Sequence, residues 1–166
     1  MKVPMSKVKL SRSKIKAIVL VCIVVLVGFD QIIKYVVDLY LKPIGSVNVI
    51  PRVLSFTYLE NDGALFGTMG GKTTFMTVLA LICCVGIIAV LFFSKMKLSV
   101  EFICIAVMLA GGLGNIIDRV FRGYVIDYIE VLFIDFYIFN FADCLITCCA
   151  IIIMIYEIYS LIKKKE

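Results

Sequence analysis

Four apolar stretches in this 166-residue chain are each long enough to cross a bilayer as a helix, which takes about 20 residues. They run approximately over residues 15–41, 73–94, 98–118 and 139–162. The second stretch contains no charged residue, whereas the first and the fourth are interrupted by charges. An apolar content of 63% also argues against an ordinary soluble domain. We therefore predict an α-helical membrane protein, with four transmembrane helices in one integral membrane domain that covers residues 1–166.

The amino-terminal segment has the basic and apolar regions of a signal peptide, but no small-residue cleavage site follows them. Instead, a helical pattern continues from Asp30 to Asp38. We interpret this segment as an uncleaved first span.

The basic residues predict the orientation in the membrane. Of the 17 lysines and arginines, six precede the first span, two lie between the second and third spans, and three follow the fourth. Because cytoplasmic loops are enriched in lysine and arginine, we expect both termini in the cytoplasm and the loops 42–72 and 119–138 outside. The net charge of +5 is then a topology signal. We expect contacts with membrane lipid headgroups and no nucleic-acid partner.

The outward loops have the composition of a small sheet and carry most of the acidic groups. Nine of the 12 acidic residues lie in these loops or in the outer halves of the spans. Runs of β-branched and aromatic residues occupy positions 47–50, 53–59 and 124–129, and such runs favour strands. We therefore predict a small β-sheet cradle on the outer face, where the chemistry is also expected.

The absence of histidine excludes Ser-His-Asp triads, Cys-His dyads and histidine-ligated zinc sites. The seven cysteines all fall inside the predicted spans and lack the spacing of a metal site. We interpret them as small packing residues without disulfide bonds. No metal and no cofactor are expected.

Ionisable residues inside a membrane span are costly and are therefore candidates for a functional site. Asp30 and Lys34 are four residues apart, so they share a helix face and can pair. The pair has two interpretations. It is either a structural ion pair that fixes the first helix, or a pair that orients other groups of the site.

A second polar cluster lies at the end of the third span. Asn115, Asp118 and Arg119 share a helix face next to closely spaced glycines, which permit close helix packing. They form either a packing seam capped by a salt bridge, or a site in which Asn115 and Arg119 bind backbone carbonyls of a substrate.

Without histidine or metal, activation of a water molecule falls to carboxylates or to a Ser-Lys pair. The outward loops offer only Ser46 and Ser55 as serines, and neither has the context of a nucleophile. Two aspartates that share a site can divide this work, since repulsion and a low dielectric raise one pKa while the other group stays ionised. Asp118, Asp127 and Asp143 are all candidates, and their spacing alone does not select the pair. The alternative is that they are unrelated surface acids. Asn140, three residues before Asp143, is expected on the same helix face.

Five sequence blocks resemble, in order, the motifs of one family: lipoprotein signal peptidase, the type II signal peptidase of bacteria. The blocks are Asp30-Gln-Ile-Ile-Lys34, Glu60-Asn-Asp-Gly-Ala-Leu-Phe-Gly67, Gly111-Gly-Leu-Gly-Asn-Ile-Ile-Asp-Arg119, Gly123-Tyr-Val-Ile-Asp127 and Phe139-Asn-Phe-Ala-Asp143. The resemblance covers nearly the whole chain. Leu65 and Tyr128 depart from the alanine and phenylalanine usual in the family, and neither change touches the expected chemistry.

The resemblance implies an aspartyl endopeptidase whose catalytic dyad is Asp127 and Asp143. It also implies supporting roles for Asp30, Lys34 and Asp118. The positions implied to bind substrate are Asn61, Gly63, Asn115, Arg119 and Asn140.

The implied substrate is a prolipoprotein whose signal peptide spans the bacterial cytoplasmic (inner) membrane and whose cysteine carries diacylglycerol. The enzyme would cut just before that cysteine, at the outer face, by general acid–base hydrolysis. Nothing in the sequence demands more than a monomer.

Two other classes of function compete with this one. A small transporter or channel would place polar residues along the full depth of the membrane, whereas here they cluster at one end of the spans. A non-catalytic membrane assembly protein would show no proteolysis when pure. An intramembrane protease of the Gly-x-Gly-Asp kind is disfavoured, because Gly112-Leu-Gly114 is followed by Asn115.

Overall fold

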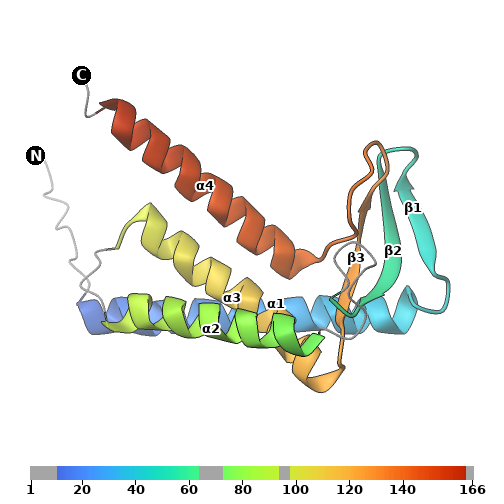
Figure 1. The fold of residues 1–166 in the computed structure, drawn as a ribbon, viewed down its shortest axis with the longest axis horizontal. Helices are drawn as coiled ribbons and strands as arrows, with labels where there is room; N and C mark the ends of the chain where they lie inside the picture. Colours follow the sequence, from blue (N-terminus) through green and yellow to red (C-terminus); the bar gives the residue numbers. More distant parts are fainter. Residues whose placement is uncertain (1–10, 64–72, 94–97, 164–166) are drawn as a thin grey trace, which may run out of the picture.

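The computed structural model describes residues 11–63, 73–93 and 98–163, and this part of the chain forms four long helices and one sheet. The helices are α1 (Arg12–Tyr40), α2 (Thr73–Phe93), α3 (Val100–Phe121) and α4 (Phe141–Lys163). Each is long and apolar enough to cross a membrane, which confirms the four predicted spans. Figure 1 shows that the start of α1 and the end of α4 lie at the end of the bundle opposite the sheet.

The helix ends differ from the predicted ones by up to three residues. α3 continues past Asp118 to Phe121, because a helix terminator comes only with Gly123, whose φ is +85°. The prediction placed Arg119 at the start of the outward loop, but Arg119 lies in the last turn of α3. α1 begins early, since the side chain of Ser11 caps it by accepting a hydrogen bond from the Lys14 N–H.

A three-stranded antiparallel sheet forms, which confirms the predicted small sheet, and it lies at the end of the helix bundle away from the start of α1 (Figure 1). Its strands are β1 (Ser46–Ile50), β2 (Leu54–Asn61) and β3 (Val125–Val131), in the order β1-β2-β3. In the β2–β3 pairing, Leu59 lies opposite Asp127 and Asn61 opposite Val125. This register brings the end of the first outward loop next to Asp127. Leu65 and the glycines at 67, 70 and 71 lie outside the described residues.

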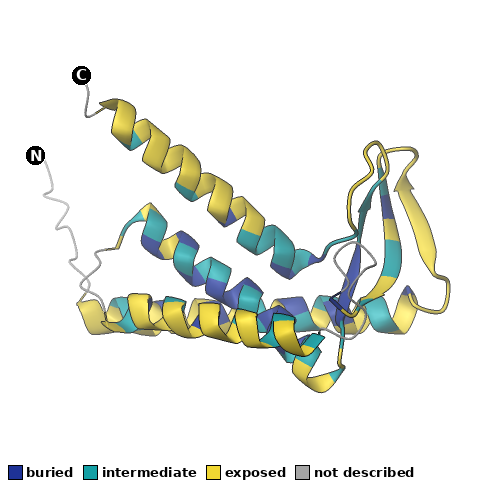
Figure 2. Ribbon diagram, in the orientation of Figure 1, coloured by how far each residue is buried: buried dark blue, intermediate teal, exposed yellow. Residues whose placement is uncertain are grey.

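α3 is the central helix of the bundle. In the most apolar 18-residue stretch of α3, 50% of the residues are buried. The buried share of the corresponding stretch is 17% in α1, 11% in α2 and 6% in α4. Figure 2 shows buried residues concentrated along α3 and β3, with exposed residues along much of α2 and α4. The exposed residues of the other helices are largely apolar, as expected for surfaces that lipid covers. All seven cysteines are free thiols, as predicted.

Gly111 sets the approach of α3 to α4, and its replacement by alanine is expected to destabilise the bundle. An added Cβ would lie 2.5 Å from the Ala142 carbonyl oxygen and 2.9 Å from Cγ1 of Ile146. Since a backbone atom cannot move aside, the helices must separate, at a cost of about 1–3 kcal/mol. Thermal unfolding in detergent measures the effect.

Gly86→Ala is the matched control, because Gly86 on α2 has open space around its Cβ position. This change is expected to leave the melting temperature unchanged or to raise it, since alanine is the better helix former. Equal melting temperatures for the Gly111 and Gly86 variants would contradict the close α3–α4 contact.

Candidate active site

Asp127 and Asp143 lie on different elements but line the same pocket. Asp127 is on β3, and Asp143 is in the first turn of α4. The pocket has a volume of about 530 Å³, and Asn61 also lines it. The rest of its wall is largely apolar and is formed by Leu59, Phe136, Tyr137, Ile138, Phe139, Cys144, Thr147 and Cys148.

Asn140 contacts both carboxylates. Its Nδ2 donates to Oδ1 of Asp127 at 2.6 Å, and its backbone N–H donates to Oδ2 of Asp143 at 3.1 Å. The Asp143 N–H in turn donates to Oδ1 of Asn140 at 3.0 Å. This reciprocal pair is a capping box at the start of α4. The prediction that Asn140 and Asp143 share a helix face is therefore wrong: Asn140 precedes the helix and caps it.

Two more asparagines complete the hydrogen bonds to the carboxylates. Asn61 Nδ2 donates to Oδ2 of Asp127 at 2.7 Å, and Asn115 Nδ2 donates to Oδ1 of Asp143 at 2.8 Å. The Gly63 N–H, at a φ of +89° that favours glycine, holds Asn61 by donating to its Oδ1 at 2.9 Å. Each of the four carboxylate oxygens thus accepts one N–H donor. The asparagines implied to bind substrate are engaged with the dyad, and their role toward substrate stays a prediction.

Burial perturbs the acidity of Asp127, which is only 1% exposed. Loss of solvent raises its pKa to about 6, and the nearby negative charge of Asp143 acts in the same direction. The hydrogen bonds from Asn61 and Asn140 partly oppose this rise by stabilising the carboxylate. Asp127 can therefore hold a proton near pH 6.

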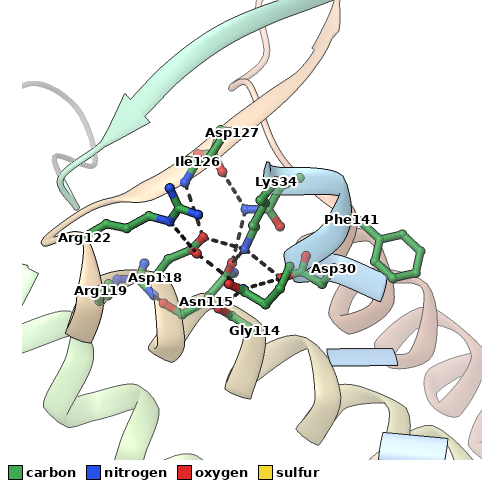
Figure 3. Close-up of polar contacts among 12 residues, drawn as sticks. Asp30, Lys34, Gly114, Asn115, Asp118, Arg119, Arg122, Ile126, Asp127 and Phe141 are labelled. Carbon is green, nitrogen blue, oxygen red and sulfur yellow. Dashed lines mark hydrogen bonds and ion pairs between the residues drawn. The ribbon is translucent and has the colours of Figure 1, made fainter. Parts of the chain in front are cut away.

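A buried ion cluster lies beside the pocket (Figure 3). The Lys34 ammonium is 2.9 Å from Oδ2 of Asp30 and 2.8 Å from Oδ2 of Asp118. The expected Asp30–Lys34 pair is thus formed, and it has Asp118 as a third member. Of the three aspartates that spacing left open, the structure joins Asp127 and Asp143 through Asn140 and pairs Asp118 with Lys34. Gly114 makes the cluster possible, because a Cβ there would lie 2.5 Å from Oδ2 of Asp30.

Arg119 lies half-buried next to this cluster, and its Nη1 donates to the Asn115 carbonyl oxygen at a long 3.5 Å. Its Nε has no hydrogen-bond partner among the described residues. The positive charge is close enough to Asp143, Asp127 and Asp118 to interact with all three. A guanidinium with spare donors beside two carboxylates can bind a carbonyl oxygen of a ligand.

Several pocket residues escaped the sequence reasoning. Thr147 and Cys148 line the pocket one turn further along α4 than Asp143 and Cys144. Their i+4 spacing was the available signal, but the cysteines looked like packing residues. Gln31, inside the first motif block, donates to Oδ1 of Asp118 at 3.3 Å.

In the described part of the chain, no group of three or more acidic or thiol side chains could hold a metal ion.

Comparison with known proteins identifies the family of this chain. The family model of signal peptidase II matches residues 22–159. The lipoprotein signal peptidase of Caldanaerobacter subterraneus subsp. tengcongensis is 44% identical over 140 residues, covering 82% of this chain and 92% of that protein. The lipoprotein signal peptidase of Streptococcus pneumoniae is 38% identical over 144 residues, covering 86% and 93%.

A solved structure described as a bacterial membrane enzyme, determined by the in meso method at 2.3 Å resolution, has the same fold. It superposes with a TM-score of 0.78 at 34% sequence identity, covering 90% of this chain and 93% of that one. With the family match over most of the chain, four membrane-spanning helices and two aspartates in one pocket, this chain belongs to the signal peptidase II family of aspartic peptidases.

Proposed function

We propose that this protein is a membrane aspartyl endopeptidase that removes the signal peptide from diacylglyceryl-modified prolipoproteins, cutting just before the lipid-modified cysteine. The observation that carries the proposal is the pair Asp127 and Asp143, both hydrogen-bonded to Asn140 and both lining one pocket. The relatives named lipoprotein signal peptidases support the choice of substrate.

The proposed mechanism is hydrolysis by a water held between the two carboxyl groups. Asp143 is the ionised base and takes a proton as the water oxygen attacks the scissile carbonyl carbon. Asp127 holds the other proton and donates it to the carbonyl oxygen, giving a neutral tetrahedral diol. The carbon–nitrogen bond then breaks, the amine leaves with the proton from Asp143, and Asp127 recovers its proton from a diol hydroxyl.

The assignment of the two roles rests on environment. Asp127 is buried, and its raised pKa of about 6 favours the protonated acid. Asp143 accepts hydrogen bonds at both oxygens, from Asn115 and from the Asn140 backbone. Asp127 accepts two such donors as well, so the roles are assigned from the raised pKa of Asp127: with Asp127 protonated, Asp143 is left as the base.

The substrate is proposed to lie along the 530 Å³ pocket in an extended conformation. The half-buried Arg119, whose positive charge acts on both Asp127 and Asp143, is the proposed donor to a substrate carbonyl. Leu59 on β2 and Thr147 on α4 lie on the pocket wall and would contact the side chains of the signal peptide. A second substrate contact is proposed for the Asn61–Gly63 turn next to Asp127.

The proposed location is the bacterial cytoplasmic membrane, with both termini in the cytoplasm and the dyad at the outer face. The sheet and the start of α4, which carry Asp127 and Asp143, lie at the end of the bundle away from the start of α1 and the end of α4 (Figure 1). This placement suits a substrate whose lipid is anchored in the outer leaflet and whose mature domain lies outside. We propose that the protein acts as a monomer, with lipid and the prolipoprotein as its partners and no nucleic acid.

A cleavage assay separates this proposal from a transporter or an assembly protein. Purified protein in detergent is incubated with a synthetic precursor that carries a diacylglyceryl cysteine, and mass spectrometry identifies the products. The proposal expects one cut, with the lipid-modified cysteine as the new amino terminus. Absence of any product from well-folded protein, at every precursor concentration tested, would overturn it.

The pH dependence tests the assignment of the proton. Below its pKa of about 6 Asp127 is protonated and active, so kcat/KM is expected to fall as the pH rises through about 6. Above that value the fall approaches tenfold per pH unit, because one proton is lost from the active form. Rates measured from about pH 4 to pH 8 give the profile. A rate that instead increases through pH 6 and stays level would mean that Asp127 is not the acid.

A further inference from the structure

Lys34 is fully buried on α1, and its ammonium has three close polar neighbours. Two are the carboxylates of Asp30 and Asp118, at 2.9 and 2.8 Å. The third is Oδ1 of Asn115, at 2.8 Å. An ammonium has three donors, so all of them are used. Two contacts are ion pairs, while the third is a hydrogen bond to an amide beside the candidate dyad.

Asn115 connects this ammonium to the dyad. Its Oδ1 accepts from Lys34 and, at 3.2 Å, from Nδ2 of Asn140. Its Nδ2 donates to Oδ1 of Asp143 at 2.8 Å. The two ends of an amide are nearly equal in shape, so its orientation is decided by its hydrogen-bond partners. A flipped amide would set its NH₂ group against an ammonium and its oxygen against a carboxylate, which leaves charged groups unpaired.

We propose that Lys34 is a positioning residue of the peptidase, whose ammonium holds the Asn115 amide in the orientation that donates to Asp143. The inference rests on the proposed function. It selects the second of the two interpretations that the sequence left open for the Asp30–Lys34 pair, and it names the group that Lys34 orients. Its consequence is positional: with the ammonium in place, the Asn115 amide donates to Oδ1 of Asp143 at 2.8 Å and holds that carboxylate where it can take the proton of the water.

We call the hydrogen bonds from Lys34 to Asn115 and from Asn115 to Asp143 the relay. Other charged groups lie close to it, and the variants must separate their effects from those of the relay. Asp30 and Asp118 face Lys34, while Asp127 and Arg119 lie within electrostatic reach of Asp143. Lys34 also acts through space on Asp127, since its positive charge opposes the rise of that pKa. A charge-balanced variant, Lys34→Met with Asp30→Asn, removes the ammonium without changing the net charge of the cluster.

The test compares kcat, KM and the pH profile of Lys34→Met and of the charge-balanced double variant with those of the unchanged protein. A group that orients a functional side chain typically contributes about 10- to 100-fold. We expect kcat to fall by about that factor with KM nearly unchanged. In Lys34→Met the fall of the profile near pH 6 is expected to move to higher pH, because the positive charge that opposes the rise of the Asp127 pKa is gone. In an Asn115→Ala background, Lys34→Met is expected to add little further loss, because the relay is already broken.

Lys42→Met is the matched control. Lys42 is on the same side of the molecule and also contacts two carboxylates, Asp38 at 3.6 Å and Glu60 at 2.8 Å, but it is 47% exposed. This variant is expected to keep the kcat and the pH profile of the unchanged protein.

The outcomes distinguish this inference from the proposed function. If the unchanged protein cleaves the precursor but Lys34→Met keeps its kcat and profile, the relay is wrong and the peptidase stands. Additive losses in the Asn115→Ala background would also overturn the relay. If neither Lys34→Met nor the charge-balanced double variant folds while Lys42→Met does, the role of Lys34 is purely structural, and the inference fails. If the unchanged protein does not cleave, the failure belongs to the proposed function.

Discussion

Replacing either Asp127 or Asp143 by asparagine is expected to abolish cleavage of a lipid-modified precursor, lowering kcat by about 10³- to 10⁴-fold. Asparagine keeps the shape of the side chain but can neither take nor give the proton. Asp127→Asn removes the proposed acid, and Asp143→Asn removes the proposed base. The initial rate of product formation at saturating precursor is the measurement.

These variants are expected to fold, because both positions already accept hydrogen bonds from amide donors that can adapt to a neutral partner. Monodisperse elution and an unchanged helical signal check this point. Asp135→Asn is the matched control. Asp135 is an exposed residue of the segment between β3 and α4, and it does not line the pocket that Asp127 and Asp143 share. It is expected to keep full activity. Substantial cleavage by Asp127→Asn or Asp143→Asn would contradict the dyad.

Asn140→Ala is expected to have the second-largest effect, lowering kcat by about 10²- to 10³-fold, the usual loss when one aligned donor is removed from a catalytic centre. Asn140 donates to Asp127 at 2.6 Å and caps α4 by accepting from Asp143. Loss of the cap also costs about 1 kcal/mol of stability. The measurements are kcat and the thermal unfolding midpoint in detergent.

Asn140→Ser separates the two roles of this side chain. Serine caps a helix about as well as asparagine, but its short hydroxyl does not extend to the carboxylate of Asp127. We expect Asn140→Ser to recover most of the stability and little of the activity. Recovery of both would mean that Asn140 acts only as a helix cap.

The helices were predictable from the sequence because length and hydropathy decide them. The second span has no charge to obscure it, and α2 ends within one residue of the prediction. The difference is larger at α3, because the charges of Asp118 and Arg119 predict the end of the span at residue 118, whereas the helix continues to Phe121. Asp118 continues the helix since Lys34 neutralises it in the interior.

The residues of the candidate site were predictable from the sequence, but most of the hydrogen bonds that join them were not. The i,i+4 spacing of Asp30 and Lys34 was enough to predict their pair. No local pattern could show that Asn115 and Asn140, on separate elements, donate to different aspartates, because these bonds depend on how β3 and α4 meet α3. The same holds for Asn140, whose place before α4 follows from its bonds to Asp143.

The pocket wall shows the same limit. Phe136 and Phe139 lie in the segment between β3 and α4, where no helical or strand periodicity indicates which way a ring points. Their position is determined by tertiary contacts, among them the backbone pairing of Phe139 with Ile129 on β3. Residues of this kind become pocket residues only when the sheet and the helix are assembled.

The shared water between Asp127 and Asp143 is tested most directly by a crystal structure of the protein bound to an uncleavable precursor peptide. In this peptide a secondary alcohol replaces the scissile carbonyl and imitates the tetrahedral diol. We predict that the alcohol oxygen lies within hydrogen-bond distance, about 2.6–3.2 Å, of a carboxyl oxygen of both residues. An alcohol that contacts only one of the two, or that binds outside the pocket they line, would contradict catalysis by this dyad.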